Sequence, residues 1–409
     1  MRKSIQKSVA ICLLGTGMFM GTPGAVVAAG TAKPAITAAD LARLPDPSTV
    51  GIRVKAGDAL PKLMAHSAVL IEAKTGKVIY EREKDTRRYP ASTTKIMTLI
   101  VALEHSKPDE IVTVGPRAVG AEGSSLNLAE GDKIPMKELL MGMMMRSGND
   151  ATIAVAEHVA GSMTAFAKMM NDKAQEIGAT DTHFVNSHGL PDDNHYTTAH
   201  DLALITAYGF TVPGYEEIVS TDRAVFNWYN DTSKEVISEN KLLWQYEGGN
   251  GGKTGYTQKA GRCVVSTAKR DGIQLVAVVL DSDFMWTDAY SMLDYGFSKV
   301  EPLPILKRGE VAGTVDVSTG AKGEIQAVAA RDSVIGYEAG AKPKIEKKLD
   351  MPGSIDAPVK KGDVVGKMIC YADGKVVDRV DLLATEDVAY HSWWMTIKEW
   401  WARLTKGLF

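Results

Sequence analysis

The sequence predicts a mixed α/β domain over residues 60–300, a small all-β domain over residues 301–390 and a terminal amphipathic helix. Short β-type runs lie near both ends of the first region, at residues 67–72 and 263–280, with helical patterns between them. This order indicates one sheet covered by helices. A Pro-x-Pro linker follows at 302–304, and short β-type runs then alternate with glycine turns, which is typical of a small sandwich or barrel.

Residues 1–29 are typical of a signal peptide. Three basic residues precede the mostly apolar stretch Val9–Met20, and Val27-Ala28-Ala29 offers a cleavage site of small residues. The alternative is an uncleaved membrane anchor, but the Gly and Pro residues over 21–24 disfavour a continuous helix and favour cleavage. Cleavage would place the protein outside the cytoplasm. Residues 30–59, which contain several Pro and Ala, are predicted to form an irregular lead-in segment.

The composition excludes other classes of protein. The chain has 409 residues, 45% of them hydrophobic, and a net charge of −3, so it can form a sizeable core and carries no nucleic-acid-binding signal. No spacing of ligand residues is typical of a metal site, and no cofactor is predicted. Cys263 and Cys370 fall in different predicted domains, and we expect both thiols to be unpaired.

The first two β-type runs, residues 67–72 and 77–81, are separated by Lys74-Thr75-Gly76. Gly76 can adopt the positive φ of a hairpin turn, so we interpret this K-T-G sequence as a turn. A second K-T-G sequence lies much later in the chain.

Ser92-Thr93-Thr94-Lys95 lies near the start of a helical pattern that runs from Pro90 to Glu104. A serine here could simply cap the helix, and S-x-x-K occurs four times in the chain. The i, i+3 spacing places Ser92 and Lys95 on one helical face. A hydroxyl beside a lysine amine is a candidate nucleophile and base for acyl transfer.

Ser147-Gly148-Asn149 separates two helical patterns, over residues 134–145 and 151–177, so we expect its side chains on a loop between helices. Another S-x-N sequence, Ser125-Leu126-Asn127, lies in a polar segment between glycines. We interpret that sequence as an ordinary turn.

Lys253-Thr254-Gly255 is predicted to lie on a strand of the main sheet. A run of glycines precedes it, and residues 263–268 and 274–280 form β-rich runs after it. The second of these runs is nearly continuously apolar, as in a buried central strand. Glycines on both sides of Lys253-Thr254 would let the backbone of a ligand approach.

These motifs supply the parts that acyl transfer through a serine requires. We interpret Ser92 as the nucleophile and Lys95 as the base, which must be a neutral amine. Burial and a neighbouring cation, for which Lys253 is the candidate, both lower a lysine pKa. Ser147 would relay the proton to the leaving amine. Asn149 would bind the substrate amide and orient Lys95.

The glycine-rich strand would bind the substrate. Lys253 and Thr254, which precede Gly255, would bind a terminal carboxylate. The backbone N–H groups of Ser92 and Tyr256 would form the site for the oxyanion.

In this order and spacing the three motifs resemble those of low-molecular-mass penicillin-binding proteins that are D-alanyl-D-alanine carboxypeptidases. The similarity also covers the segment 183–190, the β-rich tail and the amphipathic C-terminus. It implies a β-lactamase/transpeptidase-like fold, with an antiparallel sheet flanked by helices. It further implies that peptidoglycan stem pentapeptides lose their terminal D-alanine and that β-lactams acylate Ser92. Tyr256 departs from many relatives, which have a histidine after K-T-G.

Three alternatives use similar residues. A class A β-lactamase would have S-D-N in place of Ser147-Gly148-Asn149, and a carboxylate for deacylation that has no clear match within residues 181–194. A D,D-endopeptidase would cleave cross-links with the same machinery. A wall or β-lactam sensor would be acylated without turnover.

Residues 391–409 are predicted to form an amphipathic helix that lies on a membrane surface. Trp393, Trp394, Trp400 and Trp401 recur at helical spacing, with basic residues mainly toward the other side. The segment is too short and too polar to span a bilayer, and the alternative is a helix packed on its own domain. With export, this anchor predicts a peripheral protein on the extracytoplasmic face of the bacterial cytoplasmic membrane.

Overall fold

The computed structural model describes residues 60–226, 234–391 and 397. The predicted signal peptide, the lead-in segment and nearly all of the predicted anchor helix lie outside these residues. Within the described part of the chain, no helix is long and apolar enough to cross a membrane.

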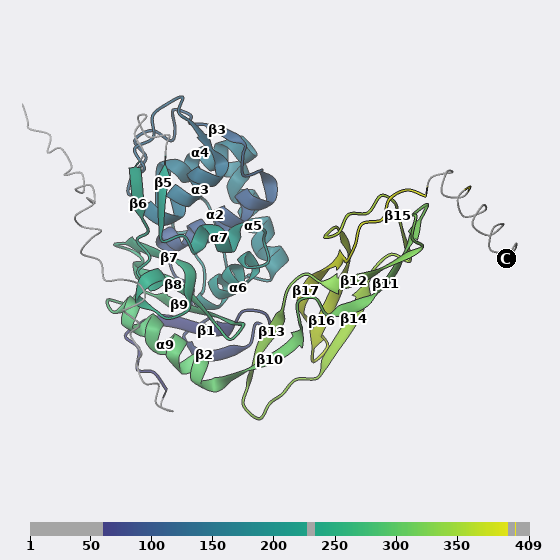
Figure 1. Cartoon of the computed structure of the whole chain (residues 1–409). Helices are drawn as coiled ribbons and strands as arrows, with labels where there is room; N and C mark the ends of the chain where they lie inside the picture. The colour runs from purple at the N-terminus through teal and green to yellow at the C-terminus, as the bar shows by residue number, and fades with distance from the viewer. Residues whose placement is uncertain (1–59, 227–233, 392–396, 398–409) are drawn as a thin grey trace, which may run out of the picture. The chain divides into compact units, whose positions relative to one another are not determined.

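The first region is built on one antiparallel sheet with the strand order β2-β1-β9-β8-β7 (Figure 1). The strands are β1 (Ser67–Glu72), β2 (Val78–Arg82), β7 (Gly249–Thr257), β8 (Gly261–Arg270) and β9 (Ile273–Leu280). Every residue of the central strand β9 is buried, which agrees with its apolar run. Strands from both ends of the region therefore share one sheet, as the sequence predicted, and K-T-G lies on the edge strand β7.

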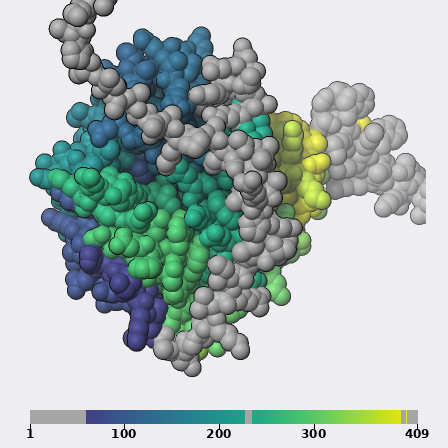
Figure 2. Space-filling view, turned by 90° about the vertical axis from the view of Figure 1, so that its left-hand side faces the viewer, coloured from purple at the N-terminus to yellow at the C-terminus, as the bar shows by residue number. Residues whose placement is uncertain are grey.

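Helices cover both faces of this sheet (Figure 1). On one side, α2 (Lys95–His105), α6 (Ala199–Gly209) and α7 (Tyr215–Val219) contact the sheet, and α3 (Met136–Arg146), α4 (Asn149–Ala160) and α5 (Met163–Ile177) pack against these helices. The other face packs against α8 (Leu242–Gln245) and α9 (Met285–Lys299). Successive strand residues point to opposite faces. Thus Val69 and Ile71 join the larger core, while Ala68 and Leu70 face α9. Figure 2 shows purple atoms from the start of the described chain beside green atoms from much later in the sequence.

The helical pattern over residues 151–177 forms two helices, not one. Gly161 has a φ of +75° and ends α4, and the Ser162 side chain accepts a hydrogen bond from the Ala165 N–H to cap α5. The earlier helix boundary also differs from the prediction, because α4 begins at Asn149. Two short hairpins lie in the connections, β3 (Ile111–Thr113) with β4 (Lys133–Pro135) and β5 (Arg223–Phe226) with β6 (Lys234–Ile237).

The C-terminal region consists of strands, which confirms the predicted fold class. A six-stranded sheet has the order β14-β16-β17-β12-β11-β15, and β10 pairs with β13 in a separate ribbon. The bounds are β10 (Val300–Leu306), β11 (Val311–Ser318), β12 (Glu324–Ala329), β13 (Ser333–Glu338), β14 (Ile345–Asp350), β15 (Ser354–Asp356), β16 (Val364–Ala372) and β17 (Lys375–Ala384). These strands enclose a core of their own. Cys263 and Cys370 are free thiols, as predicted, and both are buried.

The first K-T-G sequence forms the predicted turn, where Gly76 has a φ of +67°. It also contacts the C-terminal strands. The Lys74 Nζ lies 2.7 Å from Asp378 Oδ2 on β17, and the Thr75 hydroxyl donates to the buried Glu72 carboxylate at 2.7 Å. The other Glu72 oxygen accepts the Gly336 N–H of β13 at 3.3 Å. This turn therefore joins the two regions.

The Asp378 carboxylate accepts several hydrogen bonds at this junction. Arg331 donates to both of its oxygens, at 2.6 and 3.0 Å, and the Ser333 hydroxyl donates at 2.6 Å. Burial alone would raise the pKa of Asp378, but the hydrogen bonds from Arg331 and the charge of Lys74 outweigh it and hold this pKa well below its ordinary 3.8.

We expect Asp378→Ala to lower the free energy of unfolding by about 3 kcal/mol at pH 7, because two cations lose their buried partner. The pKa of Asp378 is lower in the folded than in the unfolded chain. The stabilisation by Asp378 is therefore complete at a pH above the unfolded pKa of 3.8, and it is lost as the pH falls toward the folded pKa. Urea denaturation at pH 7 and at lower pH measures both effects. Asp381→Ala, which removes a half-exposed carboxylate 4.0 Å from Lys367, is the matched control. Equal losses in the two variants would contradict the prediction.

Candidate active site

The Ser92 hydroxyl and the Lys95 amine meet at the start of α2. Residues 91–94 form a short 3-10 helix, η1 (Ala91–Thr94), and Lys95 is the first residue of α2. The i, i+3 spacing brings the Lys95 Nζ to 3.0 Å from Ser92 Oγ. Lys95 is fully buried, so its amine is withdrawn from water while it contacts the hydroxyl.

Asn149 reaches the same amine from the next motif. Its Oδ1 accepts a hydrogen bond from Lys95 Nζ at 2.7 Å, and its Nδ2 donates to the Glu122 carbonyl at 2.6 Å. These partners require the amide oxygen to face Lys95. Ser147, with a φ of +60°, ends α3 in the left-handed conformation, and Asn149 begins α4. The expectation that both side chains lie on a loop was therefore wrong for Asn149, which a helix holds.

Three oxygen atoms surround the Lys95 amine, because the His188 carbonyl also accepts from it at 2.9 Å. Burial and then the charge of Lys253 hold the pKa of Lys95 well below its ordinary value. A neutral amine has two N–H donors and one lone pair. The Asn149 oxygen and the His188 carbonyl can only accept, so they take the two donors and leave the lone pair for the Ser92 hydroxyl.

The second K-T-G sequence lies beside the nucleophile on β7. The Lys253 side chain is buried and donates to the Thr254 carbonyl at 3.0 Å, and burial lowers the pKa of Lys253 to about 8. Gly255 has no space for a side chain, since a Cβ there would lie 2.8 Å from the Ser92 nitrogen. Thr254 is half-buried, whereas Tyr256 is 61% exposed. The strand thus brings a lysine, a hydroxyl and the edge of the sheet to Ser92.

The structure gives Ser147 a less defined place. Its side chain is buried, but its hydroxyl forms no hydrogen bond within residues 60–226 and 234–391. Ser147 is joined to the rest of the site through the backbone that leads to Asn149.

The His188 carbonyl belongs to a segment whose role the sequence did not reveal. Asn186 fixes this turn, because its Oδ1 accepts the N–H groups of His188 and Gly189 at 3.2 and 2.7 Å. Gly189 has a φ of +89°, and a Cβ there would lie only 1.8 Å from the Ala91 carbonyl oxygen. The turn is therefore pressed against η1. The only available signal was the resemblance of residues 183–190 to a family segment.

His195 contacts η1 through the Thr94 side chain. Its Nδ1 accepts the Val185 N–H at 3.1 Å, so its Nε2 carries the proton and donates to Thr94 Oγ1 at 2.9 Å. Burial lowers the pKa of His195 to about 3, which keeps the ring neutral. Among the described residues, no group of three or more His, Cys, Asp or Glu side chains is arranged to hold a metal ion.

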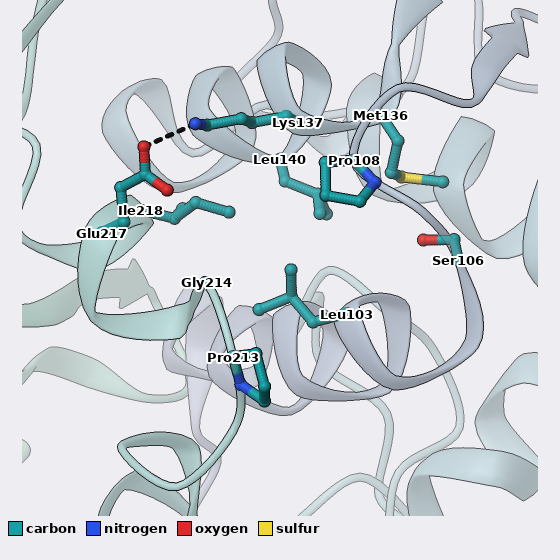
Figure 3. A pocket seen from close by; sticks show the side chains of 10 residues that line it. All are labelled: Leu103, Ser106, Pro108, Met136, Lys137, Leu140, Pro213, Gly214, Glu217 and Ile218. Carbon is teal, nitrogen blue, oxygen red and sulfur yellow. Dashed lines mark hydrogen bonds and ion pairs between the residues drawn. The ribbon is translucent and has the colours of Figure 1, made fainter. Parts of the chain in front are cut away.

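A separate cavity of about 250 Å³ lies at the opposite end of α2 (Figure 3). Apolar side chains of α2, α3 and α7 point into it, and the Lys137–Glu217 ion pair lies at its edge. Its lining residues are Leu103, Ser106, Pro108, Met136, Lys137, Leu140, Pro213, Gly214, Glu217 and Ile218. None of the predicted site residues lines this cavity, so it is distinct from the Ser92 site.

Comparison with known families identifies the family of this chain. Residues 54–284 match the family described as D-alanyl-D-alanine carboxypeptidase, peptidase S11. The chain belongs to this family. Residues 301–390 match the C-terminal domain of penicillin-binding protein 5. The predicted family resemblance is therefore confirmed.

Several family members are similar over most of their length. The D-alanyl-D-alanine carboxypeptidase DacF of Bacillus subtilis is 32% identical over 333 residues, which are 79% of this chain and 86% of that one. DacA of Escherichia coli K12 is 32% identical over 346 residues, 80% and 85% of the two chains. The structure of penicillin-binding protein 5 from Haemophilus influenzae has a TM-score of 0.59 and 29% identity, and covers 81% of this chain and 100% of that one.

We expect Gly189→Ala to lower the free energy of unfolding by about 3 kcal/mol or more, because the methyl group would overlap the Ala91 carbonyl and the backbone would be strained. Gly178→Ala is the matched control, since Gly178 has a φ of +91° but no atom within 4 Å of a Cβ. The control should lose about 1 kcal/mol from backbone strain alone. Thermal unfolding of both variants tests this, and equal losses would show that the turn can move away from η1.

Proposed function

We propose that this protein is a serine-type D-alanyl-D-alanine carboxypeptidase that removes the terminal D-alanine from peptidoglycan stem pentapeptides. The observation that carries the proposal is the buried Lys95 amine, with two fixed acceptors and Ser92 Oγ at 3.0 Å. Membership of the D-alanyl-D-alanine carboxypeptidase family supports the same substrate class.

The first half of the reaction forms an ester on Ser92. The neutral Lys95 amine takes the hydroxyl proton as Ser92 Oγ attacks the carbonyl carbon of the penultimate D-alanine. The N–H groups of Ser92 and Tyr256 stabilise the oxyanion, and a water-poor site strengthens these hydrogen bonds. The C–N bond then breaks, and the leaving D-alanine amine receives the proton from Lys95 through the Ser147 hydroxyl.

Substrate binding uses the edge strand. Lys253 and Thr254 hold the terminal carboxylate, and the absence of a side chain at Gly255 lets the peptide backbone reach Ser92. Asn149 contributes its amide to the substrate as well as to Lys95. In the second half of the reaction, water attacks the ester carbonyl, and Ser92 recovers its proton. β-Lactams would also form an ester with Ser92 Oγ, but because their amide is part of a ring, its amine would stay attached to the ester.

We expect Ser92→Ala to abolish both D-alanine release from diacetyl-Lys-D-Ala-D-Ala and covalent labelling by penicillin, because both require Oγ as nucleophile. The assay compares the wild-type chain with the variant. Ser106→Ala, which changes a serine at the far end of α2, is the control and should retain both activities.

Other outcomes of this assay have distinct meanings. Penicillin labelling without D-alanine release would favour an endopeptidase or a sensor. Rapid hydrolysis of penicillin would favour a β-lactamase. Covalent labelling of the Ser92→Ala variant by penicillin would refute the assignment of Ser92 as the nucleophile.

We also propose that the protein is exported and held at the outer face of the cytoplasmic membrane by residues 391–409. The signal-like residues 1–29 and the four tryptophans near the C-terminus support this location. We place the catalytic domain at residues 60–300 and the small β domain at residues 301–390.

We expect deletion of residues 392–409 to release the protein from membranes while D-alanine release is retained. Membrane flotation of the wild-type and shortened chains measures the change. A chain of full length with the four tryptophans replaced by serine is the control for length, and it should also float poorly. A shortened chain that still floats with membranes would contradict the anchor.

A further inference from the structure

Asp150 is a buried carboxylate directly beside the active site that the catalytic proposal does not use. It is fully buried and follows Asn149 at the start of α4. Its oxygens accept hydrogen bonds from the Ser125 hydroxyl at 2.6 Å and from the Leu126 and Leu128 N–H groups at 2.9–3.1 Å. A single buried carboxylate thus binds three residues of the segment 122–128.

This binding explains the second S-x-N sequence, Ser125-Leu126-Asn127. Its serine donates to Asp150 and accepts the Asn127 N–H at 2.9 Å, and Asn127 has a φ of +59°. The structure assigns no turn to these three residues, so the sequence is not the ordinary turn that was predicted but a segment fixed to the helix of the catalytic S-x-N.

An apolar contact fixes the same segment at another point. The Leu126 side chain lies over Gly142 and Gly148, where a Cβ would come within 2.7–2.8 Å of its carbon atoms. The Leu126 side chain therefore packs in the space that the two glycines leave open. Hydrogen bonds to Asp150 and packing of Leu126 together leave segment 122–128 little freedom to move.

The fixed segment in turn holds Asn149. The Ser124 carbonyl accepts the Asn149 N–H at 2.7 Å, and the Glu122 carbonyl accepts the Asn149 Nδ2 at 2.6 Å. Both contacts determine where the amide oxygen lies, and that oxygen is 2.7 Å from the Lys95 amine.

We propose that Asp150 is a positioning residue for acylation, which acts through segment 122–128 and Asn149 on the Lys95 amine. The inference rests on the proposed function of Ser92 and Lys95. Asp150 does not touch the reacting atoms, and its part is to keep the Asn149 oxygen where it binds one Lys95 N–H. The lone pair of the amine then remains directed at Ser92.

The test is a double-mutant cycle with a fluorescent penicillin and the full chain. Asp150→Asn places an NH2 group against the N–H groups of the segment and should displace it. We expect the acylation rate constant at saturating penicillin to fall about 10- to 100-fold, since a displacement near 1 Å can cost about 100-fold. The half-saturating concentration should change less than the rate constant, because Lys253 and Thr254 still bind the carboxylate and only the Asn149 contact with the substrate is altered.

The second background distinguishes positioning from a general loss of structure. In Asn149→Ala there is no amide to orient, so adding Asp150→Asn should change the residual rate constant less than about twofold. Asp132→Asn is the matched control, because Asp132 is a half-buried residue of the same connection whose carboxylate, among the described residues, accepts only the Ala129 N–H. Its rate constant should stay within about twofold of the wild type.

Each outcome decides between alternatives. An unchanged rate constant in Asp150→Asn, or an equal loss in both backgrounds, would overturn the inference. Should Asp150→Asn fail to fold, Ser125→Ala replaces it: a loss of about threefold that disappears in Asn149→Ala supports the inference, and an unchanged rate overturns it. Absence of labelling in the wild-type chain would instead refute the proposed function, and the inference with it.

Discussion

The structure depends on burial of one lysine. An ammonium group without a partner in this position would lose its hydration, so the fold must either supply an opposite charge or make the neutral amine the stable form. No carboxylate contacts the Lys95 amine among the described residues, and its neighbours are a hydroxyl, an amide oxygen and a backbone carbonyl. The positive charge of the buried Lys253 also lowers the pKa of Lys95. The surroundings therefore favour the form that can accept a proton.

Close backbone approaches make this arrangement possible. Gly255 lets β7 lie against the nitrogen of Ser92, and Gly189 lets the turn of His188 lie against η1. Ser147 adopts a left-handed conformation so that α3 can end directly before α4 begins. Side chains at the two glycines would push apart the three chain segments that meet at Lys95. Small residues thus act here through the space that they leave.

Much of this was predictable because it depends on local periodicity and on the order of the motifs. The apolar run of β9, the turn at Gly76 and the i, i+3 pair of Ser92 and Lys95 all follow from neighbouring residues. The carbonyl of His188 was not predictable, because a backbone group carries no residue type that marks it. The break at Gly161 and Ser162 was missed because the residues on both sides continue one helical period. The contact of Lys74 with Asp378 joins residues 304 positions apart, which no local pattern reveals.

The pairing of β1 with β9 has a consequence for how the protein acquires its chemistry. These neighbours in the sheet are separated by about 200 residues of sequence, and Lys253 lies on a strand that, among the described strands, pairs only with β8. A chain that is still emerging, or a refolding intermediate with helices alone, would hold Ser92 and Lys95 without the edge strand beside them. Contacts of such long sequence separation form late and slowly. Under the proposed function, covalent capture of penicillin would therefore report completion of the sheet, and its time course would follow the last step of folding.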